Sequence, residues 1–303
     1  MGIINRLLNS KTALNEVSRN SKLLKRLSPE EIRQLQMCLF GIYQDIRRVC
    51  DKYGLKVFLV GGSALGAVRH QGFIPWDDDM DLSMTRKDYE VFAGVFEQEL
   101  SDRYILNAPN YSERARNRFP LVMKKDSYYR TLIDSRYEEH HHVNVEIFVL
   151  ENTPDNLIHR RLKGLCCNAL SLLSWEVFIW ENRNEQIKEY LMAGGKSGYY
   201  LRVIIGFLFS FRRASEWFDT YDRAIQYHNE NSKCCCLATG RKRYFGEIMR
   251  REQWLPGVEM QFEGEKVRIF SDWDPYLRNL YGEYMQIPPE EKREVHTACE
   301  IRV

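Results

Sequence analysis

The pattern of apolar and polar positions predicts helices and strands in an irregular order along the 303-residue chain. Apolar side chains recur at helical spacing from Ile32 to Tyr53. Ser28 can cap that helix, and Pro29 suits its first turn, so a helix with one apolar face is expected over 28–53. A short apolar run over 55–60 that ends in two glycines predicts a buried strand.

The remaining pattern predicts a small mixed sheet flanked by helices. The further expected elements are helices over 63–70 and 85–100, a loop over 72–78, strands over 80–84, 104–107, 119–124 and 143–150, and a hairpin over 254–270 that turns near Glu263-Gly264. Residues 155–231 are expected to be helical with a break at Gly194-Gly195, and the last segment helical and polar. Because helices and strands do not alternate regularly, the pattern favours an α+β fold over a doubly wound one.

Composition and charge exclude some classes of protein. The chain carries 44 Lys and Arg against 42 Asp and Glu, and 44% of its residues are apolar. Such a mix indicates a folded globular protein without an overall basic field, so no nucleic-acid partner is expected. The eight cysteines contain no Cys-x-x-Cys pair, which argues against a zinc ribbon and favours free thiols in a reducing compartment.

The apolar runs bear on where the protein works. No signal-like run follows Met1, and no stretch approaches the roughly 20 uninterrupted apolar residues of a spanning helix. We therefore expect a cytoplasmic protein. Two apolar stretches, 165–180 and 199–213, suit either an anionic membrane surface or plain buried helices.

A turn at the end of the first strand is the first candidate binding element. Gly61 and Gly62 let the backbone approach a ligand closely, and Ser63 adds a hydroxyl. The free amides at the start of the next helix suit a phosphate group. Alone, such a turn is more often an ordinary connection between a strand and a helix.

A cluster of aspartates follows on the next strand. Asp79 and Asp81 point to one face of a strand, whereas Met80 and Leu82 point to the other, into a core. Two neighbouring carboxylates repel each other unless a cation lies between them, and Mg²⁺ or Mn²⁺ suits such oxygen ligands. An acidic surface loop is the alternative, but it would not need this alternation.

A third acid stands on a later strand. Glu146 lies between Val145 and Ile147, and burying an unpaired carboxylate there would be costly. We therefore interpret Glu146 as a third metal ligand or as a general base. A glycine-rich turn followed by Asp-x-Asp and a later acid is typical of the nucleotidyltransferase fold.

These residues resemble a known family. The stretches 61–70 and 72–81 closely resemble the signature of the LicD family, the phosphocholine transferases of bacterial surface polysaccharides to which the fukutin-related proteins are related. The segments 276–285 and 288–296 resemble the closing motif of that family. The resemblance implies a nucleotidyltransferase-like fold, a divalent metal, and transfer of a phospho-alcohol, typically phosphocholine from CDP-choline, to a sugar hydroxyl with release of CMP.

The resemblance also assigns roles to residues. Asp79 and Asp81 align with the family's metal-binding acids, and Glu146 replaces its third acid, usually an aspartate. The family run Asp-Ile-Phe-Pro-Leu-Asp is Glu-Ile-Phe-Val-Leu-Glu over 146–151 here, so both acids are one methylene longer. Substrate contacts are expected from Gly61, Gly62, Ser63, Arg69, Trp76, Asp78 and Glu151. Of these, Arg69 would neutralise leaving-group charge, and Trp76 would either face a quaternary ammonium or pack within its loop.

The residue pattern and the resemblance together divide the chain into four segments, and the resemblance implies a set of partners. The segments are an N-terminal arm or helix (1–27), a nucleotidyltransferase-like catalytic core (28–153), a helical insert that is a candidate for facing the membrane (154–231) and a C-terminal segment that completes the fold (232–303). The expected partners are a CDP-alcohol donor and a glycan or lipid-linked glycan acceptor. A lipid-linked acceptor favours peripheral contact with the inner face of an anionic membrane.

Several alternatives stay open at this point. The same acids would serve a nucleotidyltransferase that releases pyrophosphate, and a third reading is a non-catalytic relative that binds glycan or membrane. The histidines of 138–142 could bind a metal, but a solvated turn is favoured. The run Cys234-Cys235-Cys236 is expected to form a buried strand.

Overall fold

The computed structural model describes residues 27–193, 196–290, 293 and 298–302. Its centre is a mixed sheet with the strand order β1-β2-β6-β4-β3, to which β7 and β8 are added beside β6. The strands are β1 (Phe58–Leu59), β2 (Asp81–Thr85), β3 (Tyr104–Asn107), β4 (Leu121–Lys124), β6 (Asn144–Asn152), β7 (Cys234–Cys236) and β8 (Ile248–Arg250). Only β2 and β6 run parallel in this sheet within the described residues, which confirms the expected α+β class.

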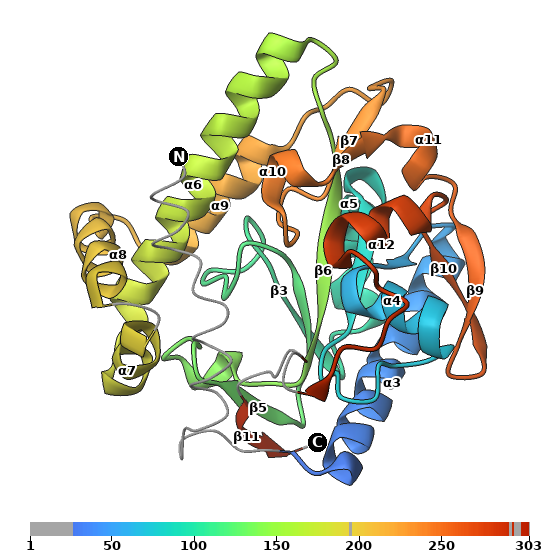
Figure 1. Ribbon diagram of the computed structural model, residues 1–303, viewed down its shortest axis with the longest axis horizontal. Helices are drawn as coiled ribbons and strands as arrows, with labels where there is room; N and C mark the ends of the chain where they lie inside the picture. The colour runs from blue at the N-terminus through green and yellow to red at the C-terminus, as the bar shows by residue number, and fades with distance from the viewer. Residues whose placement is uncertain (1–26, 194–195, 291–292, 294–297, 303) are drawn as a thin grey trace.

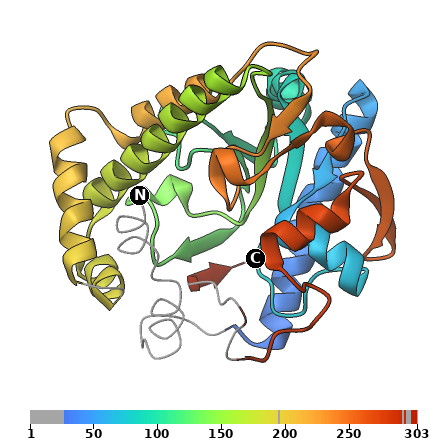
Figure 2. The same cartoon turned by 45° about the horizontal axis from the view of Figure 1, so that its top comes forward.

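Helices lie on two sides of the sheet. They are α3 (Pro29–Tyr53), α4 (Gly61–His70), α5 (Arg86–Glu99), α6 (Leu157–Asn182), α7 (Glu185–Ala193), α8 (Lys196–Phe209), α9 (Ala214–Ile225), α10 (Arg243–Gly246), α11 (Arg251–Trp254), α12 (Trp273–Tyr281) and the 3₁₀ turn η1 (Glu138–His140). Helices α6 to α9 form one group, and α3, α4 and α12 lie across the sheet from them (Figure 1, Figure 2). The helical insert therefore lies on one side of the sheet.

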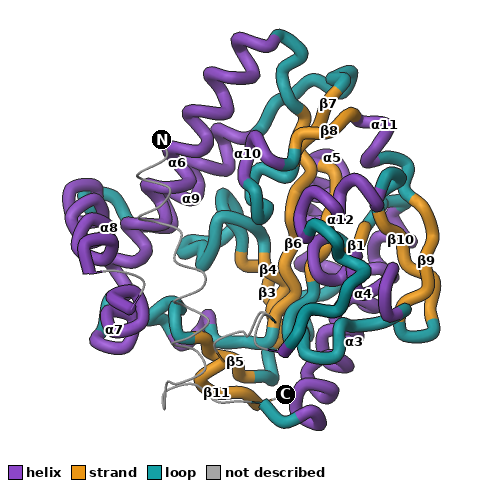
Figure 3. The backbone as a smooth tube through the Cα atoms, in the orientation of Figure 1, coloured by secondary structure: helices purple, strands orange, loops and turns teal. Residues whose placement is uncertain are grey.

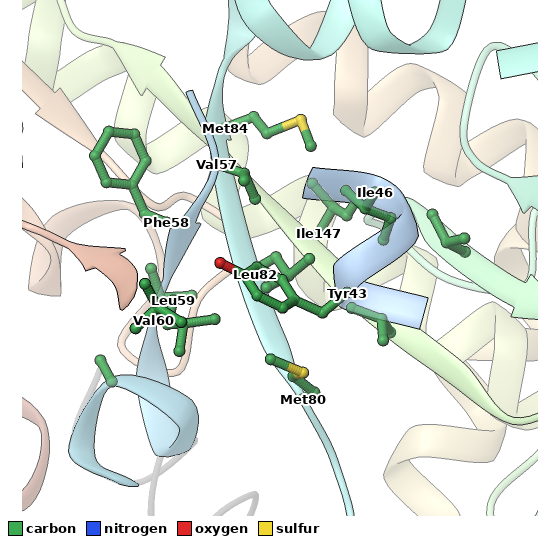
Figure 4. Close-up of a cluster of buried hydrophobic side chains, with 14 of the residues drawn as sticks. Tyr43, Ile46, Val57, Phe58, Leu59, Val60, Met80, Leu82, Met84 and Ile147 are labelled. Carbon is green, nitrogen blue, oxygen red and sulfur yellow. The ribbon is translucent and has the colours of Figure 1, made fainter. Parts of the chain in front are cut away.

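The long helix α3 forms where its sequence predicts it. Ser28 and Glu31 make a reciprocal capping box, and the helix ends at Gly54 in the left-handed region with φ +67°. The apolar face of α3 packs on the sheet, and Tyr43 and Ile46 lie beside the side chains of β2 (Figure 4). This packing buries the apolar half of β2 and so sends its acids to the other side.

The C-terminal part confirms one expectation and corrects another. β9 (Val258–Phe262) and β10 (Glu265–Ile269) form the expected hairpin, with Glu263 and Gly264 both at positive φ in the turn. The last segment is not helical throughout: α12 is a helix, but among the described residues β11 (Ala298–Arg302) pairs with β5 (Tyr128–Thr131) as a strand. Since its partner lies far away in the sequence, local pattern alone could not reveal this strand.

The insert is helical as expected over α6 to α9 (Figure 3). Three expected features lie wholly or mostly outside the described residues: the break at Gly194-Gly195, the arm over 1–27 apart from Leu27, and most of the closing motif over 288–296. Helix α6 is long and apolar enough to cross a membrane by length and composition, but 44% of its most apolar window is buried against the rest of the protein. The core helix of a folded domain passes the same test, so this property alone does not indicate a membrane span.

Candidate active site

The parallel pairing of β2 with β6 brings two acids together. In this register Asp81 lies opposite Glu146, and Leu82 lies opposite Ile147. Met80, Leu82 and Ile147 are fully buried in the core. Because side chains alternate along a strand, Asp81 and Glu146 share the other face. The expected juxtaposition of these acids is therefore present.

The glycine turn closes on the same acids. Gly61 has φ +53°, and a Cβ atom added there would collide with the Asp81 carboxylate. A Cβ atom on Gly62 would lie 2.8 Å from an Asp77 carboxylate oxygen, and the Gly62 amide hydrogen bonds to Asp81. The turn thus needs glycine because the backbone passes directly against carboxylates. The start of α4 and the acids form one wall of a site.

The carboxyl groups of this wall repel one another. Burial raises the pKa of Asp81 well above its usual value, and Asp79, Glu146 and Asp77 add to the rise. Burial and then Asp79 raise the pKa of Glu146 to about 8, against the opposing effect of Arg116. Such shifts mean that the folded protein holds negative charges close together at a cost, which a bound cation would remove.

The acids fit a divalent cation only in part. Their donors are carboxylate oxygens, which hard cations such as Mg²⁺ prefer. Within the described residues, however, no group of three or more His, Cys, Asp or Glu is arranged to hold an ion by itself. This suits a cation that takes one or two carboxylates from the protein and completes its coordination with substrate phosphates and water.

A cavity of about 430 Å³ lies above the acids. Gly61, Gly62, Asp79, Asp81 and Glu146 all line it. The lining also includes residues that the sequence analysis did not identify, namely Arg118, Thr239, Gly240, Arg241, Arg243, Glu247, Tyr276 and Tyr281. These residues come from three separate parts of the chain: the approach to β4, the segment after β7, and α12. Tyr276 and Tyr281 lie in the 276–285 stretch of the closing motif, but the other six are outside every motif identified in the sequence.

A second cavity of about 240 Å³ shares two of the acids. Asp79 and Glu146 line both cavities, and Asp78 lines the second. The Tyr129 hydroxyl donates to Asp78 at 2.8 Å, which fixes that carboxylate. Asp79 and Glu146 therefore border two cavities at once, so ligands in either cavity would lie beside the same acids.

Two residues expected to contact substrate hold the wall together instead. The Ser63 hydroxyl accepts a hydrogen bond from the Asp81 amide at 2.9 Å and is buried. Arg69 donates to the Tyr284 carbonyl at 2.6 Å. Neither Ser63 nor Arg69 lines either cavity. Their observed contacts join α4 to β2 and to the C-terminal segment.

Two further expected contacts also lie away from the cavities. The guanidinium of Arg293 lies 4.1 Å from the centroid of the Trp76 ring, and Trp76 lines neither cavity. Glu151 is fully buried and accepts from Arg86, which also donates to Asp222 at 2.8 Å. Glu151 thus belongs to an ion cluster that joins β6 to α9.

The histidine run and the cysteine run are both part of the packed structure. His140 is the last residue of the 3₁₀ turn η1 and His141 follows it. Both are buried rather than solvated, which corrects the expected solvated turn. The His140 ring nitrogen lies 2.9 Å from the Ser135 hydroxyl, and burial, reinforced by Arg116, lowers the pKa of His140 to about 4. The cysteine run forms strand β7 as expected, and all eight cysteines are free thiols.

Comparison with known proteins places this geometry in a family. Residues 54–165 match the family model described as LicD/FKTN/FKRP, nucleotidyltransferase domain. This stretch is a LicD-family domain. It contains the glycine turn, the aspartates and Glu146, so the residues that form the acidic wall all lie inside the LicD match.

Two relatives extend the comparison. The lipopolysaccharide cholinephosphotransferase LicD of Haemophilus influenzae is 26% identical over 270 residues, which cover 88% of this chain and 95% of that protein. An uncharacterised protein of Rickettsia prowazekii is 26% identical over 137 residues, 41% of this chain and 52% of that protein. The similarity to the Haemophilus protein therefore runs through the insert and the C-terminal segment as well as the LicD domain.

Proposed function

We propose that this chain transfers a phospho-alcohol, phosphocholine from CDP-choline in the first instance, to a hydroxyl of a cell-surface glycan or its lipid-linked precursor, with release of CMP. The observation that carries the proposal is the pairing of Asp81 with Glu146 under the Gly61-Gly62 turn, at a wall shared by two cavities. The similarity to a lipopolysaccharide cholinephosphotransferase over 88% of the chain supports the choice of substrates.

The residues of the wall have distinct roles in this proposal. Asp79 and Asp81 would hold Mg²⁺ or Mn²⁺, which would neutralise the phosphate charge of the donor. The turn at Gly62 gives the donor phosphates close access to the backbone. Glu146 would take the proton of the acceptor hydroxyl, or it would complete the cation site. Its pKa is raised by burial and by Asp79, so a bound cation would be needed to keep its carboxylate ionised at neutral pH.

Product analysis tests the proposal against its main rival. The protein is incubated with Mg²⁺, an acceptor glycan and a panel of CDP-alcohols, and CMP is measured; a parallel reaction with CTP is assayed for pyrophosphate. Metal-dependent release of CMP supports the transferase, whereas pyrophosphate release indicates a nucleotidyltransferase. No turnover of any nucleotide by folded protein would leave the non-catalytic binding role.

Matched variants connect the activity to the wall. Asp79→Asn and Asp81→Asn should abolish CMP release, because each removes a carboxylate from the proposed cation site. Asp102→Asn makes the same chemical change at a side chain that is 74% exposed, and it should leave the rate unchanged. Equal loss in all three variants would argue against a specific role for the acidic wall.

We further propose that the outer face of the insert contacts the inner, cytoplasmic face of an anionic membrane. Exposed apolar side chains gather on α8 and just after it, namely Tyr200, Ile204, Phe207, Leu208 and Phe211. Arg213 is exposed at the end of this run, as interfacial binding to anionic lipid requires. Flotation with anionic vesicles tests this, and Phe207→Asp with Phe211→Asp should leave the protein at the bottom of the gradient. Wild-type protein that also stays at the bottom would refute it.

A further inference from the structure

Arg118 is held at the wall of the larger cavity by the helical insert. Its guanidinium donates to the carbonyl and the hydroxyl of Ser171 on α6, and it lies 5.5 Å from the centroid of the Trp175 ring. The Nε atom of Arg118 is buried and has no hydrogen-bond partner in the described structure. A fixed guanidinium with an unused N–H donor can hydrogen bond to an acceptor atom on a ligand.

Arg118 makes no direct ion pair within the described residues. Other partly buried arginines have acidic partners: Arg116 pairs with Asp134 at 2.8 Å, and Arg202 pairs with Glu176 at 2.6 Å. Among the described residues Arg118 has no carboxylate within ion-pair distance. Burial lowers the pKa of Arg118, and the positive charge of Arg243 lowers it further, although Glu176 partly compensates. This side of the cavity therefore carries two arginines, Arg118 and Arg243, against one carboxylate, Glu247, whose pKa is raised to about 7 by burial.

The segment after β7 adds a second unpartnered group to the same cavity. The hydroxyl of Thr239 is buried without a hydrogen-bond partner in the described structure. The turn that carries it is fixed by Glu247, which accepts from the Lys242 amide at 2.7 Å and packs against Gly240. Arg243, at φ +60°, follows that turn as the first residue of α10, which packs on α6 (Figure 1). Two unsatisfied polar groups and two cations thus line one space.

We infer that Arg118, Arg243 and Thr239 form the site for the phosphate of the leaving nucleoside monophosphate. The inference rests on the proposed function and adds the residues that receive the leaving group. In the reaction the acceptor oxygen forms a bond to the phosphorus of the phospho-alcohol, and the acceptor proton passes to a base. The bond from that phosphorus to the bridging oxygen breaks, and the oxygen keeps the electron pair as CMP departs. The phosphate of CMP gains negative charge in this step, which two guanidinium groups and a hydroxyl stabilise.

A binding experiment on the product tests the site without turnover. The affinities of CMP and cytidine for the full chain are measured by calorimetry in the presence of EDTA. Because only CMP carries the phosphate, the ratio of the two affinities isolates the phosphate contribution. Arg118→Gln should reduce CMP affinity about tenfold or more, Arg243→Gln and Thr239→Val by about three- to fivefold, and cytidine affinity should not change.

The controls separate this inference from folding and from the proposed function. Thr239→Val keeps the shape of the side chain and removes an unpartnered hydroxyl, so it should fold even if Arg118→Gln does not. Arg103→Gln removes an arginine that also stacks on an aromatic ring but lines neither cavity, and it should bind CMP as the wild type does. Wild-type protein that does not bind CMP, or folded variants that bind it undiminished, would overturn the inference. CMP binding that depends on these residues, without turnover of CDP-choline, would refute the proposed function alone.

Discussion

The two ends of the β2–β6 strand pair accommodate acidic side chains in opposite ways. At one end Asp81 lies opposite Glu146, and the pKa of both carboxyl groups is raised by burial and by neighbouring acids. At the other end Glu151 accepts from Arg86, with Asp222 as a second acceptor. Glu146 and Glu151 are only five residues apart on one strand.

This difference shows how a functional acid can be told from a structural one. Burial disfavours a charged Arg86, but Glu151 and Asp222 more than compensate and raise the pKa of Arg86. That cluster pairs opposite charges and joins β6 to the insert. Burial still raises the pKa of Glu151, and its Oε2 atom has no hydrogen-bond partner in the described structure, so the pairing is partial. The Asp81–Glu146 end stays under repulsion, and it borders two cavities. An acid whose charge is left uncompensated is the better candidate for a site that receives cations and substrate.

Removal of charge from the Asp81–Glu146 end, called the unbalanced end below, should produce the largest effect on activity. Asp81→Asn should lower the rate of CMP release by about a thousandfold, because it removes a carboxylate that would hold the cation against the donor phosphates. The midpoint of thermal unfolding should stay the same or rise, since repulsion among buried acids is relieved. An unstable Asp81→Asn protein would show that the wall is structural and would break the comparison.

Removal of charge from the opposite end, where Arg86 pairs with Glu151 and Asp222, should instead affect stability. Arg86→Met leaves Glu151 and Asp222 buried without their cation and should lower the free energy of unfolding by about 3–5 kcal/mol. Urea denaturation measures this, with Arg103→Gln as the matched surface control, for which a loss of at most about 1 kcal/mol is expected. A loss as small as that of the control would show that the cluster does not stabilise the fold.

The pH dependence of stability should come from the unbalanced end. The pKa of Glu146 is about 8 in the folded protein against a usual value of 4.5, so the folded state binds more protons between these pH values. The free energy of unfolding without added metal should therefore fall as pH rises from 4.5 to 8, by an amount on the order of 3 kcal/mol. Glu146→Gln should flatten this slope, and Mg²⁺ should reduce it in the wild type. A slope unchanged in Glu146→Gln would assign the effect to other groups.

The sequence reveals features that depend on near neighbours and conceals those that depend on distant ones. The capping box at Ser28 and the turn at Glu263-Gly264 are local, and both form as expected. The strand alternation that places Asp81 on one face is local too. By contrast, Glu146 and Glu151 are acids on the same strand, and their different environments come from residues distant in the sequence, such as Arg86 beside Glu151. Arg118 and Thr239 likewise meet through tertiary packing, so no motif marks them.

The smallest expected effect tests the role of Glu151 directly. Glu151→Gln keeps the size of the side chain and leaves Arg86 paired with Asp222, so the free energy of unfolding should fall by only about 1–2 kcal/mol. Because Glu151 is fully buried and lines neither cavity, the KM for CDP-choline should stay within about twofold of the wild-type value. Steady-state kinetics and urea denaturation on the same preparation measure both quantities. A large rise in KM with unchanged stability would contradict this prediction. It would show that Glu151 contacts substrate, as the sequence analysis expects, even though it is paired with Arg86.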